Sequence, residues 1–219
     1  MTVVDERCAV PAAPAYSGPM PAAPREPASD EDLMQAYAGG DAASFDALYA
    51  RHKGGVYRYL LRHGVRPATA DEMFQDIWLS VVRARRSYVP SARFATWLYR
   101  IARNRLVDHW RASGPLVLAG DLAADADDPA DPLDRFAGPR GSEPETRAAS
   151  RELGARIGAA LAALPPAQRD AFLLHQEAGL GLAAIAELTG DGIETVKSRV
   201  RYALDKLRAG LGDIQRDFP

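Results

Sequence analysis

The stretch that most constrains this chain is RFATWLYRIARNRLVDHWR, which spans residues 93–111. Read at helical spacing, its large apolar side chains share one face and most of its arginines share another. The apolar face holds Phe94, Trp97, Leu98, Ile101 and Ala102, and the cationic face holds Arg100, Arg103, Asn104, Val107 and Arg111. Guanidinium groups suit phosphate oxygens, and an asparagine amide suits a base edge. The stretch therefore predicts an amphipathic helix that contacts nucleic acid, although a solvated surface helix fits the same pattern.

The charge of the chain is divided along its length. The total for 219 residues is only −2, but residues 40–112 carry a net +7 and residues 113–145 carry a net −6. A basic segment followed by an acidic one favours a nucleic-acid contact in the first and not in the second. The hydrophobic content of 47% is sufficient for buried cores.

The first 28 residues are rich in Ala and Pro, and we expect an extension without fixed structure there. Its Cys8 is the single cysteine of the chain, so neither an internal disulfide nor a cysteine-built metal site is expected. No cationic leader and no apolar run of membrane-spanning length precedes the basic segment. We expect a cytoplasmic protein.

Residues 29–112 are expected to form a helical bundle. Ser29 opens a short helix, a second runs from about Asp41 to His63, and a Thr69-x-x-Glu72 capping box opens a third that ends near Arg86. The helix of residues 93–111 follows a short loop. Amphipathic helices joined by short connections bury their apolar faces against one another.

The third helix is predicted to present a protein-docking surface. Its polar face includes carboxylates beside a large aromatic residue, a combination common at protein interfaces. The residues that we expect on this outward face are Asp71, Glu72, Gln75, Asp76 and Trp78. A solvated face with a partly buried Trp78 is the alternative.

Residues 113–141 are acidic and interrupted by proline, which indicates a flexible linker, and residues 142–211 return to helical patterns before a tail of residues 212–219. A short helix, Leu182–Thr189, is followed by the turn Gly190-Asp191-Gly192 and a long helix from Ile193, which is the outline of a helix-turn-helix. The donors that this last helix offers near its start are Thr195, Lys197, Ser198, Arg201 and Tyr202. A bare helical hairpin without DNA is the alternative.

Two long motifs resemble one known family. FATWLYRIARNRLVDHWR is similar to the second region of extracytoplasmic-function (ECF) sigma factors of the sigma-70 family, and ALPPAQRDAFLLHQEAGLGLAAIAELTGDGIETVKSRVRYALDKLR is similar to their fourth region. The resemblance covers residues 29–112 and 142–211. This sequence departs from the family pattern at Glu194, where a glycine is common in the family.

The resemblance implies an all-α protein with two small helical domains that directs RNA polymerase to promoters. It implies that the third helix docks on the clamp helices of the largest polymerase subunit, and that an anti-sigma protein controls the chain. It also implies that the last helix reads the −35 element, while the −10 element is melted and held by Arg93, Trp97, Arg100, Arg103 and Asn104. Single-strand capture by aromatic and cationic groups fits that role, but Trp97 lies on the apolar face and also fits the core.

Two other functions are alternatives for this sequence. A helix-turn-helix regulator would bind duplex DNA without polymerase. An enzyme would need a phosphate-binding glycine loop, a metal-spaced His/Cys set or a nucleophile motif, and the sequence offers none. We therefore expect no catalytic residue, no metal and no cofactor.

Overall fold

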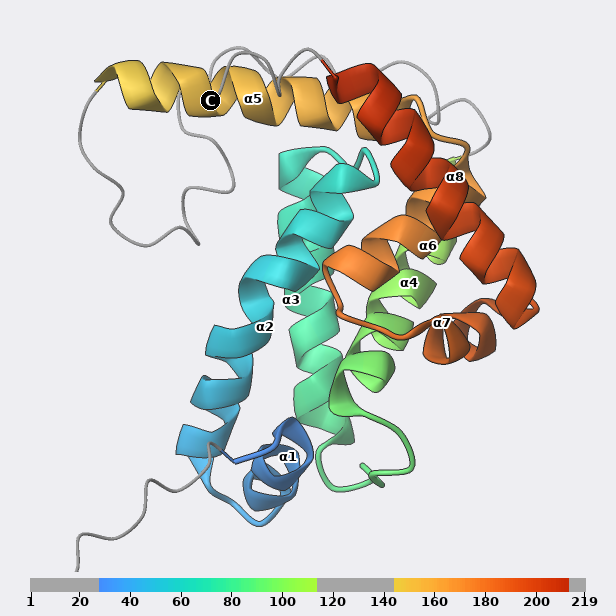
Figure 1. Cartoon of the computed structure of the whole chain (residues 1–219). Coiled ribbons are helices and arrows are strands. Elements are labelled where there is room, and N and C mark those ends of the chain that lie inside the picture. Colours follow the sequence, from blue (N-terminus) through green and yellow to red (C-terminus); the bar gives the residue numbers. More distant parts are fainter. Residues whose placement is uncertain (1–27, 114–143, 213–219) are drawn as a thin grey trace, which may run out of the picture.

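The structure, a computed structural model, describes residues 28–113 and 144–212. Within these ranges the chain is entirely α-helical and contains no strand. Four helices precede the gap and four follow it (Figure 1): α1 (Asp30–Ala38), α2 (Ala42–Arg62), α3 (Pro67–Ala84), α4 (Phe94–Ser113), α5 (Pro144–Ala162), α6 (Pro166–Gln176), α7 (Leu182–Thr189) and α8 (Ile193–Leu211). The predicted all-α fold is confirmed.

Local chemistry sets most of the helix ends. The Ser29 hydroxyl accepts a hydrogen bond from the Asp32 amide, so Ser29 opens α1 as predicted. The Asp41 carboxylate accepts one from the Ala43 amide and caps α2. Gly190 ends α7 in the left-handed conformation with φ of 76°.

The start of α3 differs from the prediction. The helix begins at Pro67 rather than at Thr69, and its N-cap residue Arg66 makes no side-chain capping bond. Proline suits the first helical position because its φ is already helical and its missing N–H would have had no partner there. The Thr69-x-x-Glu72 capping box was therefore a wrong interpretation.

The apolar side chains of α4 pack against the first three helices. Phe94, Leu98, Ala102 and Leu106 are buried, whereas Trp97 is partly buried against the core. The predicted apolar face of this helix is confirmed in its central positions.

In the second half of the chain α6 and α8 make the main contact, and α7 packs against both. Val196, Val200, Ala203 and Leu207 form the buried side of α8. Figure 1 shows α6 and α7 lying beside α4, while α5 crosses the end of the bundle. The extension, the linker and the tail predicted from the sequence lie outside the described residues, apart from their edges.

Candidate nucleic-acid interface

The cationic side of α4 is partly open and partly covered. Arg93, Arg100 and Asn104 are exposed, whereas Arg103 is half-buried. Trp97 lies half-buried with its ring centroid 5.2 Å from that of Tyr88 and 5.8 Å from that of Phe94. Arg93 therefore lies just before α4, and the other four predicted residues lie on this helix.

A carboxylate from α1 holds the start of α4. The Phe94 amide donates a hydrogen bond of 2.6 Å to Glu31 Oε1. This contact supplies a negative charge at a helix N-terminus, where the helix dipole favours it. The sequence analysis did not find this cap, because it joins residues 63 positions apart.

The turn between α7 and α8 is braced by an ion pair. Both guanidinium nitrogens of Arg199 donate to the Asp191 carboxylate, and the contact between Nη2 and Oδ1 is 3.0 Å. Hydrogen bonds from Arg199 and Thr189 lower the pKa of Asp191. The pair therefore ties Asp191, which precedes α8, to Arg199 in the second helical turn of α8.

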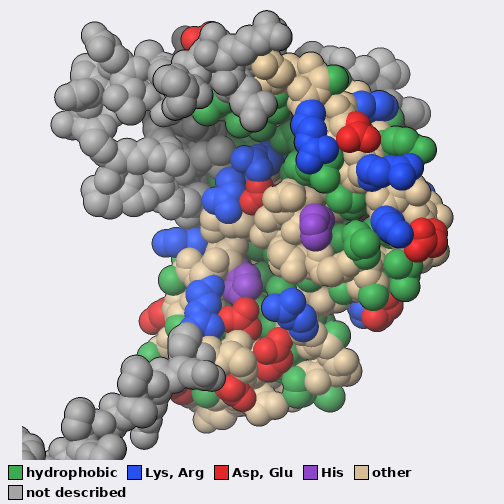
Figure 2. Space-filling model, viewed as in Figure 1, with side chains coloured by type: hydrophobic (Ala, Val, Ile, Leu, Met, Phe, Trp, Pro, Cys, Tyr) green, Lys and Arg blue, Asp and Glu red, His purple; other side chains and the backbone are tan. Residues whose placement is uncertain are grey.

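The predicted donors of α8 lie on the side away from the core. Thr195, Lys197, Arg201 and Tyr202 are exposed and Ser198 is half-buried. The Arg201 guanidinium carbon lies 5.0 Å from the centroid of the Tyr202 ring, so these two side chains form one surface. Lys and Arg side chains gather over α8 in Figure 2.

The outward face of α3 differs from the prediction in one residue. Trp78 is only 5% exposed and packs edge-on against Phe45 and Tyr49 of α2, so its predicted outward position was wrong. The other predicted residues are exposed or half-buried: Asp71, Glu72, Gln75 and Asp76. Leu79, which the sequence analysis did not single out, is 47% exposed.

An open hollow of about 340 Å³ lies over the buried Trp78. Its lining comes from α2 and α3: Phe45, Tyr49, Phe74, Gln75, Trp78, Leu79 and Val82. This part of α3 thus offers an apolar depression beside carboxylates.

The sequence analysis missed a polar contact between the two halves of the chain. Arg103 Nε donates to Asp170 Oδ2 at 2.8 Å, and Arg100 Nη2 donates to Glu187 Oε1 at 3.0 Å. The hydroxyl of Tyr59 also donates to Asp170, at 2.8 Å. Two of the predicted DNA-binding arginines are thus paired with carboxylates of α6 and α7.

The Asp170 carboxylate is strongly acidic in this site. Its burial favours the protonated form, but hydrogen bonds and charge from His63 and Arg103 outweigh burial and hold its pKa at about 2. Burial lowers the pKa of His63, so Arg103 supplies the counter-charge at neutral pH.

Two kinds of feature are absent from the described residues. No helix among them is long and apolar enough to cross a membrane. They also contain no group of three or more His, Cys, Asp or Glu side chains that is arranged to hold a metal ion.

Comparison with known proteins agrees with this geometry. The family model for Sigma-70 region 2 matches residues 48–115, and the model for Sigma-70, region 4 matches residues 154–207. The ECF RNA polymerase sigma factor RpoE of Cereibacter sphaeroides is 35% identical over 178 residues, which cover 77% of this chain and 86% of that protein. The RNA polymerase sigma factor CarQ of Myxococcus xanthus is 31% identical, over 83% of this chain and 97% of that protein.

Two solved structures share the fold. CnrH in complex with the cytosolic domain of CnrY matches with a TM-score of 0.58 at 23% identity, over 84% of this chain and 97% of that one. The sigma factor RpoE in complex with the anti-sigma factor NepR, from Bartonella quintana, matches with a TM-score of 0.55 at 20% identity, over 77% of this chain and 96% of that one. This chain belongs to the ECF RNA polymerase sigma factors of the sigma-70 family, and it is a transcription initiation factor that acts in promoter recognition.

Proposed function

We propose that three separate surfaces of this chain divide the work of initiation: α3 docks on core polymerase, α4 holds the −10 element, and α8 reads the −35 element. The observation that carries the proposal is the two-sidedness of α8. Val196 and Val200 anchor it to the core, while Lys197 and Arg201 face outward. A helix anchored in this way presents its polar side to the major groove.

The α4 surface suits an unpaired strand. Trp97 offers a partly exposed ring for a base, and the exposed Arg100 and Asn104 lie one and two helical turns further along the helix. Stacking of an unpaired base on an aromatic ring favours single-stranded over duplex DNA, and guanidinium groups hold the phosphates of that strand. Arg93 and Arg103 complete the set that we assign to the −10 element.

The α3 surface suits a protein partner that presents both apolar and polar groups. Leu79 and the hollow beside it offer apolar contact, and Gln75 and Asp76 lie exposed next to them. We assign this surface to the clamp helices of the largest polymerase subunit. Trp78 shapes the hollow from within the core and takes no direct part at the rim.

We further propose that an anti-sigma protein restrains the chain. Of the two structural neighbours, the sigma factor RpoE was solved with the anti-sigma factor NepR, and CnrH was solved with the cytosolic domain of CnrY. We also propose that residues 29–112 and 142–211 are separate domains. The chain acts where the bacterial chromosome is transcribed, in the cytoplasm, and contributes no catalytic group or cofactor of its own.

Transcription from a randomised promoter library, with core polymerase and the purified chain, tests this function. We expect transcripts whose templates share two sequence elements at a fixed spacing, and none without the chain. Tight, sequence-specific binding of the chain alone to duplex DNA, with no transcription, would instead favour an ordinary helix-turn-helix regulator.

A further inference from the structure

We propose that the chain carries a binding site for a small amphipathic anion, a monocarboxylate with an apolar body, in a cavity between the end of α2, α5 and the start of α6. The site lies apart from the surfaces of α3, α4 and α8 that we assign to polymerase and to the promoter. None of those roles uses its residues, so the site goes beyond the proposed function and does not depend on it.

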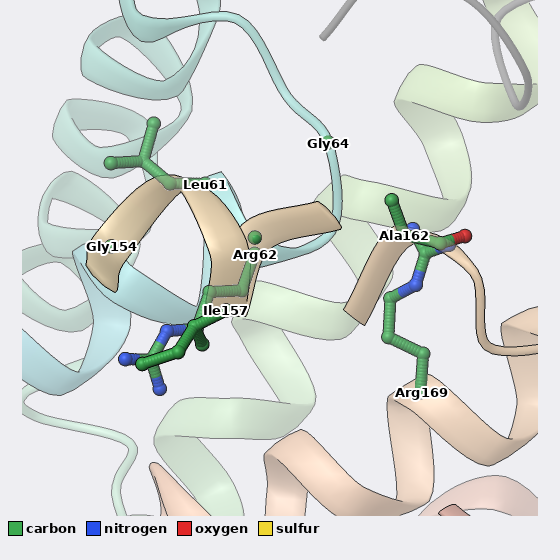
Figure 3. A pocket seen from close by; sticks show the side chains of 8 residues that line it. Leu61, Arg62, Gly64, Gly154, Ile157, Ala162 and Arg169 are labelled. Carbon is green, nitrogen blue, oxygen red and sulfur yellow. The ribbon is translucent and has the colours of Figure 1, made fainter. Parts of the chain in front are cut away.

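The cavity is small and mainly apolar. Its volume is about 170 Å³, and its lining includes Leu61, Arg62, Gly154, Ile157, Gly158 and Arg169. Figure 3 shows Leu61, Arg62 and Ile157 lying together, with Arg169 across the pocket. An apolar cavity of about 150 Å³ in another protein accepts benzene. The cavity therefore has room for a single aromatic ring or a short alkyl chain.

Arg169, near the start of α6, places an uncompensated charge in the wall. The residue is only 6% exposed, and its Nη2 atom donates to the backbone carbonyls of Ala162 and Leu164. Its Nε is buried without a hydrogen-bond partner, and no carboxylate of the described residues pairs with the guanidinium. Burial therefore lowers the pKa of Arg169. A buried cation without a counter-ion is costly, and an anion bound beside it would offset that cost.

The second guanidinium in the wall, that of Arg62, leaves the surroundings positive. Arg62 donates to Glu177 Oε1, and Arg58 donates to Oε2 of the same carboxylate at 2.8 Å. Two guanidinium groups thus share one carboxylate, and the lining residues of the cavity include no Asp or Glu. Together with Arg169, this excess of positive charge favours an anion over a neutral or cationic molecule.

Two glycines of α5 keep the cavity open. Gly154 and Gly158 are four positions apart, so they lie on one face of the helix, and both line the cavity. A Cβ atom at either position would meet nothing outside its own helix within 4 Å. Protein packing therefore does not require glycine at either position, although each glycine weakens the helix by about 1 kcal/mol relative to alanine. A ligand would occupy the space that they leave.

Benzoate is the probe, because it joins one carboxylate to one apolar ring. Benzyl alcohol has a similar ring without the charge, and acetate has the charge without the ring. Each is titrated into the isotope-labelled full-length chain, and the shifts of backbone amide signals in NMR spectra report both the affinity and the place of binding. Gly158→Leu puts a side chain into the cavity. Gly210→Leu is the matched control, because Gly210 also lies in a helix and its Cβ would meet only Ala160, at an ordinary 3.9 Å.

We expect saturable binding of benzoate that shifts the amide signals of Gly64, Gly154 and Gly158 at the cavity and leaves that of Gly190 in place. Benzyl alcohol and acetate should each bind at least about tenfold more weakly than benzoate. Gly158→Leu should weaken benzoate binding by at least about tenfold, and Gly210→Leu should not change it.

Benzyl alcohol that binds as tightly as benzoate would overturn the preference for an anion. Equal benzoate affinity in Gly158→Leu and the parent would overturn the location of the site, and the absence of saturable benzoate binding would overturn the whole proposal. None of these measurements uses polymerase or DNA, so their outcome is distinguishable from failure of the proposed function.

Discussion

Arg103 Nε lies 2.8 Å from Asp170 Oδ2, although the two residues are 67 positions apart in the chain. The sequence places Arg103 on a DNA-binding face, and the structure places a carboxylate on it. The pair joins α4 to α6, across the two halves of the chain.

The paired Asp170 carboxylate should make the stability of the fold sensitive to acid. The pKa of Asp170 is held at about 2, against an ordinary value of 3.8, and the groups that face it are His63 and Tyr59 of α2 and Arg103 of α4. Because the folded-state pKa is depressed, the stabilisation is fully present above the ordinary value and is lost as pH falls toward 2. The loss is on the order of 2 kcal/mol.

Thermal unfolding of the parent chain and Asp170→Asn, followed from about pH 5 down to about pH 2.5, checks this stability prediction. The melting temperature of the parent should fall more steeply, because only the parent loses the paired carboxylate. Asp205→Asn is the control, since Asp205 forms an exposed pair with Arg208. Parallel curves for the parent and Asp170→Asn would contradict the role given to this carboxylate.

Glu31→Ala should loosen the start of α4. The variant removes the carboxylate that accepts the Phe94 amide, which we expect to cost about 1 kcal/mol. Hydrogen exchange at the first amides of α4 should speed up by roughly fivefold, the equivalent of that energy. Glu72→Ala, an exposed glutamate on α3, should leave exchange there unchanged. Equal hydrogen-exchange protection of these amides in Glu31→Ala and the parent would contradict a capping role for Glu31.

Substitutions at Trp78 and at Asp76 should affect folding and polymerase docking separately. Trp78→Ala removes a buried ring from the α2–α3 aromatic cluster and should lower the free energy of unfolding by about 3–5 kcal/mol. Asp76→Arg should keep helicity, because Asp76 is exposed and lies 3.8 Å from Arg105 in a weak pair, but it should reduce affinity for core polymerase. Circular dichroism and core-binding titrations measure the two effects. Undiminished core affinity in Asp76→Arg would take this face out of the polymerase interface.

The parts of the fold that sequence predicted are those set by local chemistry. Ser29 caps the helix that follows it, and Gly190 ends α7, because each acts on neighbours within a few positions. Helical spacing also predicted the buried positions Phe94, Leu98 and Ala102 of α4, since one face of a helix repeats at a fixed period.

The errors and omissions depend on contacts between distant segments. Trp78 shares a helix with exposed carboxylates, and only the approach of Phe45 and Tyr49 from α2 buries it. The pairs of Arg103 with Asp170 and of Arg58 with Glu177 join residues on opposite sides of the acidic segment. Periodicity describes one helix at a time, so it carries no information about which carboxylate meets which guanidinium.

Transcription with single-residue variants of α4 and α8 assigns each promoter element to its helix. Core polymerase is combined in turn with the parent chain, Arg201→Ala, Lys197→Ala and Asn104→Ala, and the transcripts from a randomised promoter library are sequenced. Arg201→Ala should relax the upstream element alone, by about 1–3 kcal/mol at the affected base, and Asn104→Ala should alter the downstream element alone. Lys197→Ala should lower output without changing either preference, because a phosphate contact carries no sequence information. If promoters that differ in the upstream element kept the same order of transcript yield with Arg201→Ala, Arg201 would not read that element. Transcription that does not require the chain would contradict its role in promoter recognition.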